Sequence, residues 1–424
     1  MARLGVFCFP GTGHINPMTA LARQLQQRGH RVVFFGIADT EARVRAAGAE
    51  FCLIGTKDYP PGALDRLDNE LAQLKGLRAF RFTAERIRNT ALMVLRDGPE
   101  AVRRANIEAL LVDEADMAGS VADHLGLPFV SIAVIPPLVD SDRIPPFFFG
   151  WRPGVGPLSR LRNRMGICLL TYIAADIFAA VNEQRMTWGL ARFRRPAEAL
   201  SPLAQVAQMP AALEFETAVR PSGLHYAGPF VDARYRPAVE FPWDQLDDRP
   251  LIYASFGTLQ NGAQKIFRAV AEACAGLEAR LVISLGGGLE PESLDGLAGN
   301  PIVVKYAPQL ELLKRASAVI THAGINTVLE SLAEGVPLVC TPLGNDQPGV
   351  AARVVARGAG VMVPWRKLTP ARLRACVLAV LQDRRFRQAA RELQTAICRI
   401  HGLELAADII EEELNIRMLS QSRD

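Results

Sequence analysis

The chain has 424 residues, of which 49% are hydrophobic, and a formal net charge of +4. One hydrophobic core rarely serves a chain of this length, so we expect two domains. The small net charge, with no block of Lys and Arg, argues against nucleic acid as a partner. The seven cysteines are scattered without CxxC spacing. That usage argues against a disulfide framework or a zinc site and favours a reducing cytoplasm.

The sequence indicates neither a secretory signal nor a membrane span. Its first residues enter a predicted strand at once, with no long apolar segment before a cleavage site. The most hydrophobic window, residues 167–181, contains Asp176. It is shorter than the roughly 20 residues that a spanning helix needs. We therefore expect a soluble, cytoplasmic protein.

Strands and helices alternate through the first half of the chain. Residues 3–36 are predicted as a strand, an amphipathic helix that begins near Pro17 and ends at Gly29, and a second strand. Residues 41–55 continue the alternation, and residues 107–134 form another strand–helix–strand unit. Such alternation predicts a parallel, doubly wound sheet.

A second series of the same kind begins at residue 251, after residues 232–250 interrupt the first. That interruption is charged and contains three prolines, which indicates a linker. We predict an α/β protein with two doubly wound domains, residues 1–231 and 251–383. Residues 384–424 are predicted to be helices that pack back toward the first domain. Parallel sheets of this kind bind ligands at the carboxyl ends of their strands, so the ligand site is expected in the cleft between the domains.

The turn "THAGINT", residues 321–327, follows a predicted strand and opens a helix. Backbone N–H groups and the positive end of a helix dipole converge at such a turn, which suits a diphosphate. Asn326 and Thr327 add side-chain donors, and His322 lies just before the small residues of the turn. On its own, a glycine-containing turn of this type is usually only a turn.

Other candidate ligands stand close by in the sequence. Glu330, one helical turn beyond Asn326, can accept hydrogen bonds from ribose hydroxyls. Asp346 and Gln347 follow the predicted strand 336–342 and suit a polyhydroxylated group. "SFGT", residues 255–258, follows another strand and can supply further donors.

The candidate residues within residues 306–347, taken together and in this order, are a more specific signal of a ligand site than any one of these motifs alone. It resembles the donor-binding signature of family 1 glycosyltransferases, which are UDP-sugar-dependent enzymes with two Rossmann-like domains (the GT-B fold). The match runs through Ala307, Pro308, Gln309, His322, Gly324, Asn326, Thr327, Glu330, Gly335, Pro337, Pro342, Asp346 and Gln347.

The resemblance implies a role for each matched position. Gln309 and the backbone of Ala307 would bind uracil, and Glu330 would bind the ribose. His322, Asn326 and Thr327 would hold the diphosphate, and Asp346 and Gln347 would bind the sugar. The other candidate donor-site residues are Gly324, in the same turn as Asn326, and Ser255, Gly257 and Thr258, which follow another predicted strand. Plant members usually begin this motif with Trp, whereas this chain has Tyr306. A deoxythymidine-linked sugar is therefore an alternative donor.

"GTGHINP", residues 11–17, resembles the N-terminal "GHxxP" turn of the same family. The resemblance implies that His14 is the general base that deprotonates an acceptor hydroxyl. An imidazole suits this task because its unperturbed pKa, near 6.5, leaves much of it neutral at cellular pH. The family histidine is held by an aspartate at the end of a later strand. Asp113 fits that position, and Asp116 is the alternative.

This arrangement favours a single in-line displacement with inversion of the sugar. The resemblance implies no cofactor and no metal, since the helix dipole and His322 would neutralise the diphosphate. Residues 143–195 hold nine arginines and two acidic residues interleaved with aromatics. This composition suggests a lipophilic acceptor, with Phe147, Phe148 and Trp151 as its contacts, and peripheral contact with an anionic membrane. Ordinary core helices with solvated arginines are the alternative interpretation.

Residues 201–216, 224–230 and 321–338 resemble bacterial zeaxanthin glucosyltransferases, so a carotenoid is the first acceptor to consider. Macrolide-type and flavonoid-type acceptors are the nearest alternatives. A retaining glycosyltransferase or a sugar-nucleotide epimerase on the same fold is a further alternative, which would not need His14. A non-catalytic nucleotide-sugar-binding subunit is disfavoured, because both His14 and Asp113 are present. A nicotinamide oxidoreductase is disfavoured, because "GTGHIN" lacks the third glycine of GxGxxG and no acidic residue ends "RVVFFG".

Overall fold

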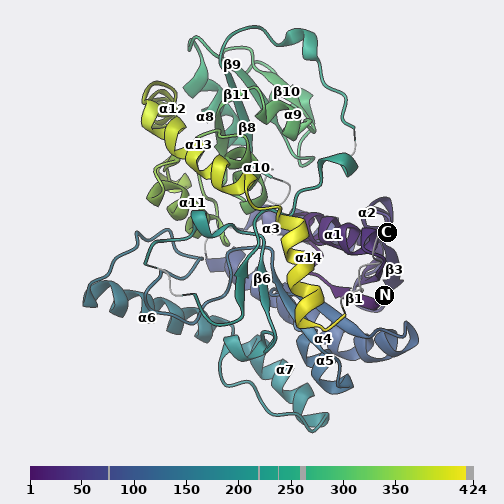
Figure 1. The fold of residues 1–424 in the computed structure, drawn as a ribbon. Helices are drawn as coiled ribbons and strands as arrows, with labels where there is room; N and C mark the ends of the chain where they lie inside the picture. Colours follow the sequence, from purple (N-terminus) through teal and green to yellow (C-terminus); the bar gives the residue numbers. More distant parts are fainter. Residues whose placement is uncertain (75–76, 218–219, 237, 258–263, 417–424) are drawn as a thin grey trace, which may run out of the picture.

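The computed structural model describes residues 1–74, 77–217, 220–236, 238–257 and 264–416. It contains two parallel sheets, one in each half of the chain (Figure 1). The first sheet has the strand order β3-β2-β1-β4-β5-β6-β7, and the second has the order β10-β9-β8-β11-β12-β13. The predicted fold class, two doubly wound parallel sheets, is confirmed.

The first sheet and its helices fill the N-terminal half. Its strands are β1 (Arg3–Phe7), β2 (Arg31–Gly36), β3 (Glu50–Leu53), β4 (Ala109–Asp113), β5 (Phe129–Ala133), β6 (Gln205–Ala207) and β7 (Leu224–Tyr226). Its helices are α1 (Thr12–Gln27), α2 (Ala38–Ala46), α3 (Ala63–Gln73), α4 (Leu77–Arg104), α5 (Gly119–Leu125), α6 (Pro157–Ile173) and α7 (Ala175–Thr187). The strands β4 and β5 are buried throughout, as expected of a sheet covered on both faces.

The second sheet organises most of the C-terminal half. Its strands are β8 (Leu251–Ser255), β9 (Arg280–Ser284), β10 (Ile302–Val304), β11 (Ala316–Thr321), β12 (Leu338–Cys340) and β13 (Gly360–Met362). The helices are α8 (Gln264–Cys274), α9 (Gln309–Leu313), α10 (Ile325–Ala333), α11 (Gln347–Ala356), α12 (Pro370–Gln382), α13 (Arg384–Cys398) and α14 (Gly402–Glu413).

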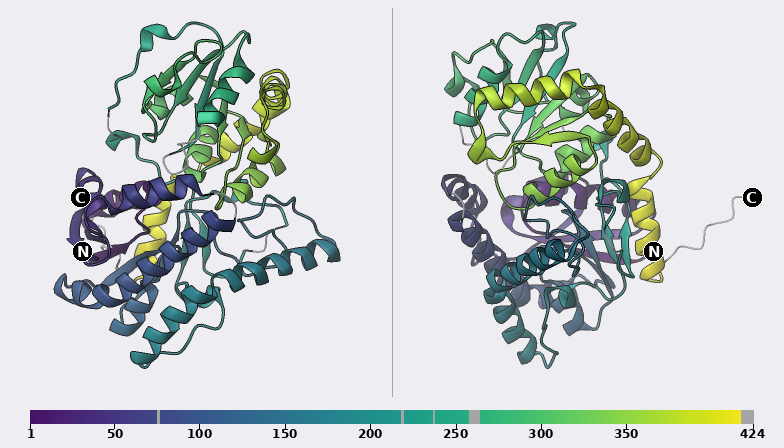
Figure 2. Two further views of the ribbon diagram at one scale, coloured as in Figure 1. Left: turned by 180° about the vertical axis from the view of Figure 1, so that it is seen from behind. Right: turned by 90° about the vertical axis from the view of Figure 1, so that its left-hand side faces the viewer.

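The last helix returns to the first half of the molecule. Helix α13 packs against α10, whereas α14 packs against α1, and Figure 2 shows α14 running down beside the first sheet. The apolar side of α14 joins the core beneath β1, and Arg28 at the end of α1 bonds to Asp408 at 2.6 Å and to Glu411 at 3.0 Å. Chain segments far apart in sequence thus share one core.

Helix α1 begins earlier than its apolar pattern indicates. The pattern places the helix start near Pro17, because proline favours the first helical turn. In the structure the helix begins at Thr12, after Gly11 in extended conformation, and Pro17 lies inside it. His14 therefore stands in the first turn of α1 and not in a loop before it.

A buried ion pair also joins the two halves. Met209 and Leu213, between β6 and β7, pack into the core of the second half. Next to them, the carboxylate of Glu214 accepts Arg353 Nε at 2.8 Å and Arg353 Nη2 at 3.0 Å. Both side chains are almost fully buried. Such paired geometry compensates for much of the cost of removing two charges from water.

Within the described ranges, no single helix is long and apolar enough to cross a membrane. Helices α6 and α7, which are bent by 56° relative to each other, reach the length and hydrophobicity of a membrane span only when they are taken together.

Candidate active site

The two sheets bring their switch points, where the strand order reverses, to the same region. In the first sheet β1 lies between β2 and β4, and in the second β8 lies between β9 and β11. His14 follows β1 and Asp113 ends β4. Ser255 ends β8 and His322 follows β11. Residues predicted from distant motifs therefore stand at the strand ends where this class of sheet binds ligands.

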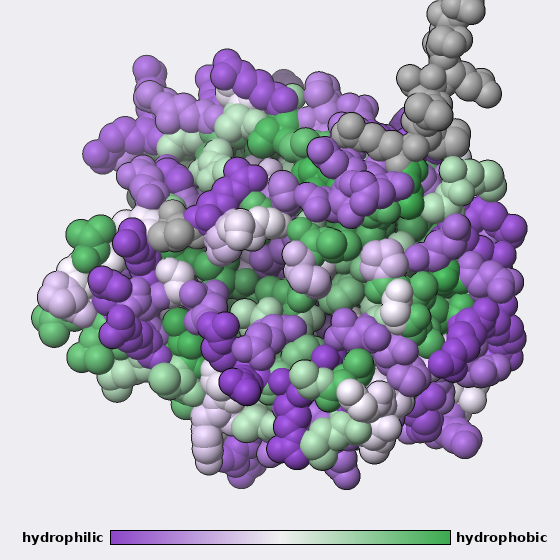
Figure 3. All heavy atoms as spheres, turned by 60° about the horizontal axis from the view of Figure 1, so that its bottom comes forward, coloured by the Kyte–Doolittle hydropathy of each residue, from purple (hydrophilic) through white to green (hydrophobic). Residues whose placement is uncertain are grey.

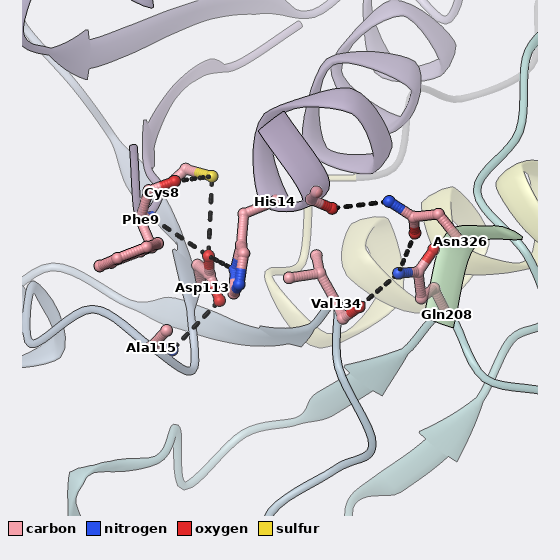
Figure 4. A network of polar contacts seen from close by, with 9 residues as sticks. Cys8, Phe9, His14, Asp113, Ala115, Val134, Gln208 and Asn326 are labelled. Atoms are coloured by element: carbon pink, nitrogen blue, oxygen red, sulfur yellow. Dashed lines mark hydrogen bonds and ion pairs between the residues drawn. The ribbon is translucent and has the colours of Figure 1, made fainter. Parts of the chain in front are cut away.

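The carboxylate of Asp113 holds the ring of His14. Asp113 Oδ2 lies 2.7 Å from His14 Nδ1, and the aspartate side chain is fully buried (Figure 4). The same carboxylate accepts the backbone N–H of Phe9 at 3.2 Å and that of Ala115 at 3.1 Å. Because Nδ1 is engaged, Nε2 is the ring nitrogen that can take a proton from a substrate.

Opposing influences act on the pKa of His14. Burial is the largest of them and lowers the pKa. The charge and hydrogen bond of Asp113, with the charge of Asp346, raise it more, so the pKa lies above the ordinary value of 6.5. Burial in turn raises the pKa of Asp346 to about 6, against the opposing charge of His14. The two groups, one from each half of the chain, therefore influence each other electrostatically.

Asp116, the alternative partner, has another contact. Its Oδ1 accepts the backbone N–H of Ala118 at 2.9 Å, in the turn that leads into α5. Burial, followed by the charge of Asp113, raises the pKa of Asp116 to about 7. The structure thus brings Asp113 to His14 and uses Asp116 to stabilise a turn.

His322 packs between two glycines. A methyl group added at Gly324 would lie 2.5 Å from its ring, and one at Gly257, whose φ is +71°, would lie 2.8 Å away. Burial lowers the pKa of His322 to about 4, opposed by a backbone hydrogen bond at Ser255. The ring is neutral near pH 7, so it can donate a hydrogen bond but carries no positive charge. Thr258, predicted beside Gly257, lies outside the described residues.

Glu330 and Gln309, the predicted ribose and uracil ligands, are bonded to each other. Gln309 Nε2 donates to Glu330 Oε2 at 2.5 Å, and the hydroxyl of Tyr253 donates to Gln309 Oε1 at 3.1 Å. Arg236, from the predicted linker, forms an ion pair with Glu330. An arginine in a charged linker has no distinguishing sequence pattern, so sequence reasoning missed it.

Tyr306 lies over the glycine turn that follows β9. Its side chain is half-exposed, and a methyl group at Gly287 would lie 2.0 Å from its hydroxyl oxygen. Ala307 next to it is partly buried against the core of the second half. The ring is thus placed at the surface, beside the helix that Gln309 begins.

Asp346 and Gln347 lie at the start of α11. Gln347 is buried, and its Oε1 accepts the backbone N–H groups of Leu343 at 2.8 Å and Gly344 at 3.1 Å. This oxygen holds the loop after β12 in place. In the ranges described here, no group of three or more His, Cys, Asp and Glu side chains could hold a metal ion.

Asn326 makes contacts across the two halves of the molecule. Its Nδ2 donates to the backbone oxygen of Gly13 at 2.8 Å, and its Oδ1 accepts Gln208 Nε2 at 3.0 Å (Figure 4). Thr327, the next residue, is buried in α10. Gln208 was not singled out by sequence reasoning, because a lone glutamine after a short strand has no recognisable pattern.

The predicted acceptor aromatics form a packed segment. The rings of Phe147 and Phe148 lie 4.4 Å apart. Trp151 stacks on Phe149 at 4.1 Å. The backbone of Phe147 presses against α11, where a methyl group at Gly349 would lie 2.0 Å from its carbonyl oxygen. This segment therefore reaches the helix that Asp346 and Gln347 begin.

The aromatic ring that contacts His14 is that of Phe9, which is not one of the predicted acceptor residues. Phe9 meets the imidazole edge to face, with the ring centres 5.3 Å apart, and sequence reasoning gave it no role. Trp151 instead packs against α6, under Arg162 at 4.9 Å and close to Gly166. The sequence signal for Phe9 was its place two residues after the end of β1.

Known proteins match nearly the whole chain. Residues 243–401 match the family model described as UDP-glucoronosyl and UDP-glucosyl transferase, and residues 7–96 match the glycosyltransferase family 28 N-terminal domain. The chain is 30% identical over 415 residues to a zeaxanthin glucosyltransferase of Pantoea ananas, covering 97% of this chain and 96% of that one. It is 32% identical over 423 residues to a zeaxanthin glucosyltransferase of Pseudescherichia vulneris, covering 98% of each.

Solved structures show the same fold. The crystal structure of the glycotransferase of kitacinnamycin superimposes with a TM-score of 0.75 at 22% identity, covering 97% of this chain and 98% of that one. The chain therefore belongs to the family 1 UDP-glycosyltransferases, which have the GT-B fold, and it is an enzyme of that class.

Proposed function

We propose that the enzyme moves a sugar, in the first instance glucose, from a UDP-sugar to a hydroxyl of a lipophilic acceptor with inversion. The His14–Asp113 pair, electrostatically coupled to Asp346 of the other half, is the observation that carries this proposal. Residues 1–231 bind the acceptor and residues 251–383 bind the donor, with residues 232–250 as the linker.

The reaction is a single displacement. His14 Nε2 takes the proton from the acceptor hydroxyl as its oxygen attacks the anomeric carbon. The bond between that carbon and the diphosphate oxygen breaks on the opposite face, and UDP leaves with the electron pair. Asp113 stabilises the imidazolium that forms and keeps Nδ1 protonated.

The donor site is proposed to lie along the carboxyl ends of β8, β11 and β12. Its diphosphate binds at the start of α10, where the helix dipole supplies the positive potential that a neutral His322 cannot. Ribose hydroxyls compete with Arg236 for Glu330, and uracil lies between Tyr306 and Gln309. Asp346 and the amide nitrogen of Gln347 bind the sugar.

A carotenoid such as zeaxanthin is the proposed acceptor. Two relatives at 30% and 32% identity carry the name zeaxanthin glucosyltransferase. Phe147, next to α11, Phe148, which packs on Phe147, and Phe9, at His14, offer apolar contacts for such a molecule. Macrolide-type or flavonoid-type acceptors, and a dTDP-sugar as donor, are the alternatives.

We further propose that the enzyme is cytoplasmic and makes peripheral contact with the inner face of the membrane through residues 143–195. Helix α6 carries large apolar side chains that are between 49% and 82% exposed: Leu158, Leu161, Met165, Leu169 and Tyr172. Their spacing of three and four residues places them on one side of the helix. Figure 3 shows apolar side chains along the projecting left edge, where Figure 1 places α6.

The charge around α6 suits an anionic lipid surface. Residues 143–175 contain five arginines and no acidic residue. Asp142 pairs with Arg160 at 3.1 Å and with Arg164 at 2.6 Å, which neutralises part of that charge. The exposed apolar side of α6 therefore carries more of this proposal than the arginines do.

The base assignment is tested by kinetics. His14→Ala should lower kcat by about 10²–10⁴-fold, the usual contribution of a positioned base. Only the neutral ring accepts a proton, and its pKa lies above 6.5, so turnover should rise with pH through that pKa and then level off. Asp113→Asn should lower the plateau and move this rise to lower pH, because it removes the charge that raises the pKa.

Asp116→Asn is the matched control for the base assignment and should leave the pH profile in place. Near-normal turnover of His14→Ala would contradict the assignment. A larger loss in Asp116→Asn than in Asp113→Asn would show that Asp116 is the partner.

The donor assignment is tested by thermal shift. UDP should raise the melting temperature by mass action, and Glu330→Ala or His322→Ala should shrink that rise. Glu334→Ala, at the far end of the same helix, is the control and should keep it. A shift with NADH and none with UDP would favour an oxidoreductase. Stronger protection by dTDP than by UDP would move the donor to a deoxythymidine-linked sugar.

The membrane contact is tested with vesicles of phosphatidylglycerol and phosphatidylcholine. The enzyme should co-sediment with them, and salt should release part of it. A variant with three asparagines on α6 should bind at least about tenfold more weakly, because it loses apolar area that would enter the bilayer. Its turnover on a soluble phenol should be unchanged. The substitutions are Leu158→Asn, Leu161→Asn and Met165→Asn.

The control variant replaces three exposed leucines elsewhere and should bind vesicles as the wild type does. Its substitutions are Leu53→Asn, Leu203→Asn and Leu405→Asn. Unchanged vesicle binding by the α6 variant would reject the proposal. A change of oligomeric state in that variant alone would show that a second copy of the chain covers α6.

A further inference from the structure

A proline inside α1 leaves one backbone carbonyl open. Pro17 has no N–H, and in an α-helix the N–H of residue 17 would donate to the carbonyl of Gly13, four residues earlier. That carbonyl accepts Asn326 Nδ2 at 2.8 Å, from the other half of the molecule. The proline thus removes the backbone donor that would compete for this contact.

Gln208 orients the amide of Asn326 from the other side. Its Nε2 donates to Asn326 Oδ1 at 3.0 Å and also to the backbone oxygen of Val134. Gln208 follows β6 and Val134 follows β5, and the glutamine side chain is only 1% exposed. Since Asn326 Oδ1 receives this bond, its NH2 group is the one left to donate to the carbonyl of Gly13. Figure 4 shows the side chains of Gln208 and Asn326 facing each other.

The contact between Asn326 and Gly13 links the segment that carries His14 to the start of α10. The distance between these two parts of the site matters for sugar transfer. Gly13 directly precedes His14, whose ring is fixed at Nδ1 by Asp113. Asn326 is the second residue of α10, at the end where the diphosphate is proposed to bind. A displacement of about 1 Å in such a site can lower the rate by about 10²-fold.

We propose that Pro17, Gln208 and Asn326 form an interdomain latch that positions His14 relative to the donor. This inference rests on the proposed role of His14 as the base. Pro17 and Gln208 are positioning residues, since they act through Gly13 and Asn326. Asn326 has a second N–H that can serve the diphosphate, so the latch is tested at the other two positions.

The test compares two helix prolines in the same half of the chain. Pro17→Ala restores an N–H that competes for the carbonyl of Gly13, and Gln208→Ala releases the amide of Asn326. Each should lower kcat by about tenfold or more, while KM for the UDP-sugar and the thermal shift with UDP stay unchanged. Pro99→Ala, a buried proline inside α4, is the matched control and should keep the wild-type kcat.

Hydrogen exchange tests the latch in the enzyme without bound substrates. The backbone amides of residues 328–330, the first in α10 that have helical partners, should exchange faster in Pro17→Ala and Gln208→Ala and at the wild-type rate in Pro99→Ala. Wild-type kcat and exchange in the first two variants would overturn the latch. So would an equal loss in Pro99→Ala, or a parallel loss of donor affinity. If the wild type transfers no sugar although exchange responds as expected, the proposed function fails and the positioning role fails with it.

Discussion

The arrangement of side chains around His14 depends on one buried carboxylate, that of Asp113. A charge taken out of water costs several kcal/mol unless it is paired, so its partners are held firmly. Those partners come from the loop after β1, from α1 and from the turn after β4. The same carboxylate therefore sets the ring orientation of His14, leaves Nε2 as the nitrogen that can accept a proton and raises the pKa of the ring.

The two halves of the molecule are joined by contacts between segments far apart in sequence. Glu214 and Arg353 form a buried pair between the two halves, and α14 returns to pack on α1. With these contacts in place, Asp346 and His14 influence each other electrostatically, and Asn326 reaches the carbonyl that Pro17 leaves open. The site is thus a product of the interface and not of either sheet alone.

Local sequence patterns predicted the strands, the helices and the turns that carry candidate residues. They did not predict the contacts between the two halves of the molecule. Apolar periodicity predicted both parallel sheets, and turn chemistry placed His14 and His322 after strands. The start of α1 was wrong, because Pro17 gives a strong signal for a first turn although a helix can continue through it. Arg236 and Gln208 became visible only in three dimensions, because their partners Glu330 and Asn326 lie far away in the sequence.

The stereochemistry of the product tests the central claim most directly. A base on the acceptor side, with UDP leaving from the opposite face, requires inversion at the anomeric carbon. Proton NMR of the glycoside formed from α-linked UDP-glucose and a soluble phenol reads that configuration. The account predicts a β-glycoside. An α-glycoside would contradict it, because retention requires a different mechanism in which His14 is not the base of a single displacement.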